Sequence, residues 1–98
     1  MLGQRVLRLS APVQVVGQTS STPGEPTLVN IDGLVYDLVV VNRSVDYSLY
    51  VSFDGGSRYV EVAPDSALVV VLAAGNVAVA VKSDGASQPF KVVYRLIL

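Results

Sequence analysis

Apolar and polar residues alternate along much of the chain, which is the pattern of β-strands that bury one face. Residues 47–53 (YSLYVSF) show this pattern most clearly, with a large apolar side chain at every second position. Further strands are predicted at residues 27–31, 34–41, 58–62, 67–72, 77–82 and 90–98, and shorter extended pieces at residues 5–9 and 12–16. No window longer than about ten residues carries the 3.6-residue apolar period of an amphipathic helix.

Turn signals separate these strands. The sequence DGGS at residues 54–57 favours a hairpin, because glycine accepts positive φ without steric cost. A second hairpin is predicted around residues 75–76, a Gly-Asn pair that divides an uncharged run. That run is shorter than the ~17–25 residues of a membrane-spanning helix. Turns about every 8–12 residues predict an all-β fold, a single antiparallel, jelly-roll-like β-sandwich of about eight strands with an N-terminal extended arm.

The amino-acid composition supports the all-β prediction. Valine supplies 21 of the 98 residues, and strong helix formers such as Glu, Lys and Met are few. Valine is stiff at its first side-chain torsion and packs well on a pleated surface.

One segment differs in composition from the rest. Residues 17–26 (GQTSSTPGEP) are small and polar, which predicts a flexible linker or loop. It separates an N-terminal arm with short strands, residues 1–16, from a β-sandwich body, residues 27–98. Such an arm can add a strand to a neighbouring subunit or pack back on its own sandwich, and the sequence leaves both arrangements open.

The strands carry more apolar positions than one core needs. If Leu38 and Val40 point inward, Val39 and Val41 point outward, where an isolated sandwich would show polar residues. The candidate assembly interface comprises Leu7, Leu9, Val13, Val15, Val39, Val41, Val69, Val71, Ala78 and Ala80, with Val93 and Ile97 as further outward positions. The alternative is that some of these side chains are simply exposed, because over half of an ordinary protein surface is apolar. We expect a homo-oligomer or assembly onto a larger structure.

Catalytic chemistry has little support. The chain has no His and no Cys, which excludes Ser-His-Asp and Cys-His arrangements, zinc-thiolate sites and disulfides. Most acidic residues fall in predicted turns, where Asp bonds the nearby backbone. We therefore predict no catalytic residue, no metal ligand and no cofactor, and no enzymatic activity. A formal net charge of −1 argues against a nucleic-acid partner, and no membrane partner is expected.

Two short motifs suggest surface binding. Tyr50, Arg58 and Tyr59 flank the predicted 54–57 turn and could contact a carbohydrate or a partner protein, although we favour the alternative that Tyr50 and Tyr59 pair across the hairpin. Asn42 begins an N-x-S glycosylation pattern. We discount that pattern because the N-terminus shows no signal peptide.

The motifs VNRS at residues 41–44, LYVSFDGG at 49–56, VAP at 62–64 and VKS at 81–83 resemble small virion proteins of tailed bacteriophages. The resemblance implies a head decoration protein, often trimeric, that binds the major capsid protein on the capsid surface after synthesis in the host cytoplasm. A tail or fibre component is the close variant. A carbohydrate- or cell-surface-binding module and an accessory domain of a larger assembly are the alternatives.

Overall fold

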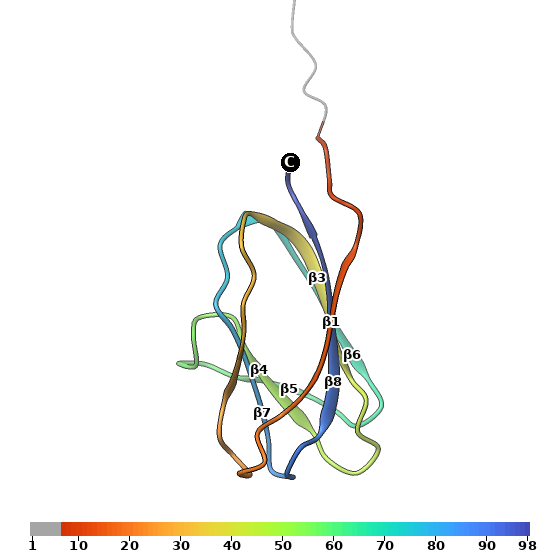
Figure 1. Ribbon diagram of the computed structural model, residues 1–98, viewed down its shortest axis with the longest axis vertical. Coiled ribbons are helices and arrows are strands. Elements are labelled where there is room, and N and C mark those ends of the chain that lie inside the picture. The colour runs from red at the N-terminus through yellow and green to blue at the C-terminus, as the bar shows by residue number, and fades with distance from the viewer. Residues whose placement is uncertain (1–6) are drawn as a thin grey trace, which may run out of the picture.

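The computed structural model describes residues 7–98, apart from the side chains of residues 73 and 74 (Figure 1). Within this range every regular element is a β-strand. The strands are β1 (Val13–Gln18), β2 (Thr27–Val29), β3 (Val35–Asn42), β4 (Leu49–Ser52), β5 (Val60–Val62), β6 (Ala67–Gly75), β7 (Val79–Ser83) and β8 (Pro89–Leu96). The all-β prediction with about eight strands is confirmed.

The strands form two four-stranded antiparallel sheets, in the orders β1-β8-β3-β6 and β2-β7-β4-β5. The pairing is nested along the chain, with β1 beside β8, β2 beside β7, β3 beside β6 and β4 beside β5. The two sheets lie against each other as layers, with β7 and β4 in one and β8 and β3 in the other (Figure 1). The predicted β-sandwich is therefore present.

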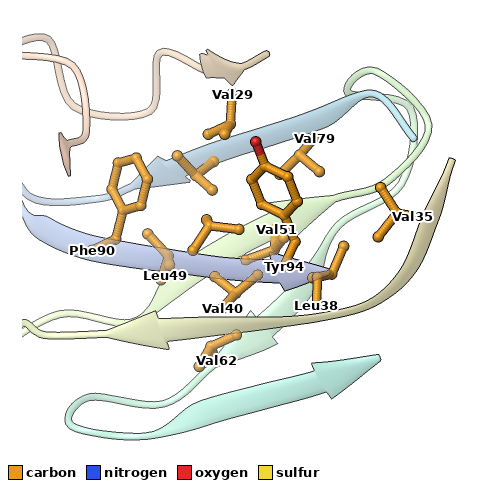
Figure 2. Close-up of a cluster of buried hydrophobic side chains, with 12 residues drawn as sticks. Val29, Val35, Leu38, Val40, Leu49, Val51, Val62, Val79, Phe90 and Tyr94 are labelled. Carbon is orange, nitrogen blue, oxygen red and sulfur yellow. The ribbon is translucent and has the colours of Figure 1, made fainter. Parts of the chain in front are cut away.

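The hydrophobic core lies between the two layers (Figure 2). It is formed by Val29, Val35, Leu38, Val40, Leu49, Val51, Val62, Val79, Val81, Phe90, Val92 and Tyr94. Most of these residues occupy alternate strand positions, because successive side chains of a strand point to opposite faces. In β8 the alternation is complete from Phe90 to Tyr94, as the sequence predicts.

A buried asparagine joins the two layers. Asn42 at the end of β3 is 1% exposed, and its Nδ2 lies 2.9 Å from the carbonyl oxygen of Tyr47, 3.0 Å from that of Val62 and 3.2 Å from that of Ala63. Its Oδ1 accepts the N–H of Ser44 at 3.0 Å. The amide that begins the N-x-S pattern is therefore buried and hydrogen-bonded in the folded chain.

The N-terminal segment packs on its own sandwich from Val13 onward. All six residues of β1 pair with β8 of the same chain, and Ser10 and Arg8 continue the contact through hydrogen bonds with Leu96 and Leu98. An arm that reaches a neighbour is not confirmed, and its first six residues lie outside the described range. The predicted boundary at residue 16 falls inside β1, although the division into arm, linker and body stays a prediction.

Two predicted hairpins are wrong in detail. Strands β6 and β7 belong to different sheets, so the Gly75–Asn76 region crosses between the layers instead of forming a hairpin turn. Between β4 and β5, residues 53–59 form a longer loop than the DGGS motif predicts. Ser52 Oγ accepts the N–H of Gly56 at 2.8 Å, and the Asp54 carboxylate accepts two further N–H groups of this loop. These side-chain oxygens accept from backbone N–H groups that a tight hairpin would pair with backbone carbonyl groups.

Candidate functional site

The outer face of the β1-β8-β3-β6 sheet carries a patch of valines. We call it the valine face, and it consists of Val16, Val39, Val41, Val69, Val71 and Val93. Val39 lies at its centre, in register with Val69 on β6 and with Val93 on β8. Val69, Val71 and Val16 are 67%, 65% and 61% exposed. Apolar side chains therefore run across all four strands on the side of the sheet that faces away from the core.

Polar groups border this patch along the strands. Lys91 lies in register with Val41 and Val16 at one end. At the other end, Arg95 Nε donates to Asp37 Oδ1 at 2.9 Å, and a second guanidinium nitrogen bonds the other carboxylate oxygen. The hydrogen bond from Arg95 lowers the pKa of Asp37 below its ordinary value. An apolar centre with a polar rim is the usual anatomy of a protein–protein contact.

The predicted interface residues divide into those on this face and those elsewhere. Val39, Val41, Val69 and Val71 lie on it, as their strand positions predict. Val13 and Val15 point to the opposite side, because they pair with Tyr94 and Val92, whose side chains are in the core. Val13 and Val15, named as interface residues of the N-terminal arm, therefore do not belong to the valine face, and Val16 takes the outward position on β1.

The predicted alanines do not contribute to the valine face. Ala80 lies on the other sheet, is 0% exposed and sits in register between Leu28 and Ser52, so the prediction that it is available to a partner is wrong. Ala78 is exposed just before β7, where it bridges to Asp54. Leu7 and Leu9 precede β1 in the chain. Leu7 is exposed, and Leu9 pairs with Ile97.

The outer face of the β2-β7-β4-β5 sheet is mainly polar and aromatic, with Leu28 on the edge strand β2 as an exposed apolar residue. Tyr50 on β4 lies in register with Lys82 on β7 and Glu61 on β5, and we call this group together with Tyr59 the tyrosine face. Lys82 Nζ lies 4.1 Å from the centre of the Tyr59 ring. The negative charge of Asp84, with burial and the charge of Glu61, raises the pKa of Tyr50 above its ordinary value. A cation on an aromatic ring and paired polar groups stabilise this face within the chain.

The tyrosine face differs from the predicted arrangement in two ways. Tyr50 pairs with Glu61 in the β4–β5 register, so the direct pairing of Tyr50 with Tyr59 is wrong. The sequence analysis did not identify the contact of Lys82 with the Tyr59 ring. Its position could have indicated it, because Lys82 lies two residues after Ala80 and therefore points to the same, outer side of β7. Arg58 is exposed and donates its backbone N–H to Asp54, and a binding role for its side chain stays a prediction.

Other sites of chemistry are sparse. A groove of about 370 Å³ lies between residues 28–32 and residues 77–79, with Asn30 and Asp32 as its polar side chains. Among residues 7–98 no group of three or more possible metal ligands comes together, and no helix long and apolar enough to cross a membrane is present. In comparisons with protein-family models, with curated proteins and with solved structures, nothing matches this chain.

Proposed function

We propose that this chain is a non-enzymatic structural protein of a phage virion, a capsid decoration protein that attaches through the valine face. The single observation that carries the proposal is the exposure of Val16, Val69 and Val71 on a sandwich whose core is already complete. Folding alone does not require valine at these positions, because an antiparallel sheet with one solvated face normally shows polar residues there. Contiguous exposed apolar patches rimmed by polar groups mark interaction sites.

The strand order supports the finer fold assignment. Nested pairing of eight strands in two four-stranded sheets is the arrangement we expect of a jelly roll, an architecture common in viral capsid proteins and lectins. The motif resemblance over residues 41–83 points the same way. Both are analogies at the level of fold, and the function itself rests on the surface.

The attachment mechanism is burial of apolar area. The valine face would cover a complementary apolar surface on the major capsid protein or on another copy, with a trimer as the oligomer that the resemblance implies. Burial contributes about 25 cal/mol for each Å² of apolar surface removed from water. A protein that bridges neighbouring capsid subunits in this way adds contacts that must break before the shell ruptures.

The experiment compares one lysine substitution on each outer face. Val39→Lys places a charge at the centre of the valine face, and Leu28→Lys places the same charge on the other sheet, at a residue that is 65% exposed. Undecorated capsids of the encoding phage are incubated with each full-length variant and sedimented. Val39→Lys should weaken binding at least about 30-fold, the size of a central hot spot, whereas Leu28→Lys should bind within about threefold of wild type. Equal binding by both variants would overturn the proposal.

The tyrosine face supports one second candidate, binding of a carbohydrate or cell surface. Tyr50 and Tyr59 belong to one surface with Lys82, and aromatic rings beside polar groups can stack on a sugar ring. A glycan array would show binding by the wild type and its loss in the Tyr50→Ala/Tyr59→Ala variant. A signal unchanged in that variant would remove this candidate.

A further inference from the structure

The four edge strands of the sandwich differ in how they are protected from other chains. Strands β2 and β5 are three residues each, and β1 is preceded by Pro12. Strand β6 has nine residues without a charge or a proline, and within the described structure it pairs with β3 alone. Short strands, charges and prolines are the usual means of blocking edge-to-edge pairing. Strand β6 is therefore the longest edge strand, and its regular part from Ala67 to Val71, before the register shift against β3, carries none of these protections.

The register identifies the free backbone groups of β6. Asn42 N–H donates to the carbonyl oxygen of Ser66 at 2.8 Å, so even-numbered positions here direct their backbone groups toward β3. Because these directions alternate along an antiparallel strand, Ala67, Val69 and Val71 direct theirs away from β3. Partner side chains could pack there too, since Leu68, Val70 and Leu72 contact the core but are only partly buried.

We propose that β6 pairs antiparallel with β6 of a second copy of this chain. Around a two-fold axis at Val70, the N–H and C=O groups of Val69 bond those of Val71 in the other copy, and the reverse. The two β1-β8-β3-β6 sheets then become one eight-stranded sheet, and the two valine faces become one continuous surface. The second copy is the favoured occupant because the segment is self-complementary: it is uncharged and presents valine to valine across the axis.

This contact deepens the proposed function, on which it rests for its biological setting, because it names the first partner of the assembly surface. Its geometry is two-fold, which separates it from the trimer that the motif resemblance implies. It can be measured on the purified chain without a capsid, so its failure and that of the proposed function are separate results.

The test uses two doubly charged variants of the full chain. Val69→Lys/Val71→Lys sets like charges opposite each other across the proposed axis. Gln14→Lys/Gln18→Lys serves as the matched control, because it adds equal charge to the same outer face on β1, the opposite edge of the sheet, at exposed residues outside the valine face. Light scattering is measured at concentrations up to about 1 mM, at which a contact with a Kd of about 1 mM is about half formed. Wild type and control should both show a dimer. The β6 variant should remain monomeric at the same concentrations, with circular dichroism to confirm its fold.

Hydrogen exchange on the wild type tests the contact even if the β6 variant fails to fold. The backbone amides of Val69 and Val71 should exchange at least about tenfold more slowly in the dimer than at monomeric dilution, because pairing protects edge amides. A wild type that stays monomeric, a trimer, or a dimer that leaves these two amides unprotected would each overturn the inference. A trimer, or a dimer packed face to face, would still agree with the proposed function.

Discussion

The two outer faces of this sandwich are built by the same strand alternation and differ in whether their side chains find partners within the chain. On the tyrosine face, Lys82 lies on the Tyr59 ring and Glu61 accepts a hydrogen bond from Ser48 at 2.8 Å. On the valine face, Val69 and Val71 remain about two-thirds exposed. On the second sheet Leu28 is the exposed aliphatic residue and polar contacts occupy the rest of the outer face, whereas on the valine face exposed valines occur on both β1 and β6.

That difference separates what folding requires from what assembly requires. The core between the sheets is closed by residues of both layers, so neither outer face needs to be apolar for the chain to fold. The exposed aliphatic surface of the valine face therefore supports the proposal that a partner covers it. The uncharged β6 edge lies on the same sheet, which places the two unprotected features of the molecule together.

The largest expected effect comes from Asn42→Ala. This substitution should destabilise both sheets at once and so act on both outer faces equally. Asn42 lies on β3, and its Nδ2 bonds the carbonyl oxygen of Val62 on β5, so it connects the sheets that carry the two faces. Removing the amide leaves buried carbonyl groups without a donor, which should lower the free energy of unfolding by about 3 kcal/mol. Urea denaturation followed by circular dichroism measures this loss.

The control is Asn30→Ala, an exposed asparagine between β2 and β3. Its free energy of unfolding should stay within about 0.5 kcal/mol of wild type, as for most surface substitutions. If Asn42→Ala also fell within 1 kcal/mol of wild type, the asparagine would not be the connection between the sheets that its geometry indicates.

A smaller effect, confined to the tyrosine face, is expected for Lys82→Gln. Loss of the cation from the Tyr59 ring should cost about 0.5–1 kcal/mol of stability, the usual range for an exposed cation–π contact. Lys82→Arg should retain most of the contact. Lys91→Gln, beside Val41, is the matched control on the valine face and should change stability by less than about 0.5 kcal/mol. Equal losses for Lys82→Gln and Lys91→Gln would contradict a stabilising role for the Tyr59 contact.

Most of the strands could be predicted because their side chains alternate between one buried and one outer face. The alternation places Val39, Val41, Val69 and Val71 outward, and the structure agrees. It does not decide residues 13–16 (VQVV), because adjacent valines at positions 15 and 16 leave the phase of the alternation undetermined. Only the pairing with β8 shows which of them faces the core.

The remaining differences come from long-range pairing. The sequence around residues 75–76 suits a hairpin turn. In the structure, however, β6 pairs with β3 in the sheet that also holds β8, and β7 belongs to the other sheet, so β6 and β7 end in different layers. Local turn preference cannot reveal this long-range pairing. Ala80 alternates outward as expected and is buried nonetheless. Its cross-strand neighbours, Leu28 and Ser52, come from distant parts of the chain, so the local pattern does not show its surroundings. Tertiary contacts of this kind are not encoded in the local pattern.

The smallest effect concerns the rim of the valine face and depends on pH. The hydrogen bond from Arg95 lowers the pKa of Asp37 below the ordinary value of 3.8, so the unfolded chain binds this proton more readily than the folded chain does. The resulting stability is fully present above the unfolded pKa and is lost as the pH falls through the lower, folded pKa. In Asp37→Asn, urea midpoints measured from pH 6 to pH 3 should therefore fall less steeply than in wild type. The variant Asp37→Asn/Arg95→Gln should show the same shallower slope, because removing Arg95 has no further effect once the carboxylate is gone. A slope unchanged in Asp37→Asn would mean that the ion pair at this rim adds no acid-sensitive stability, and that the two outer faces differ in apolar exposure alone.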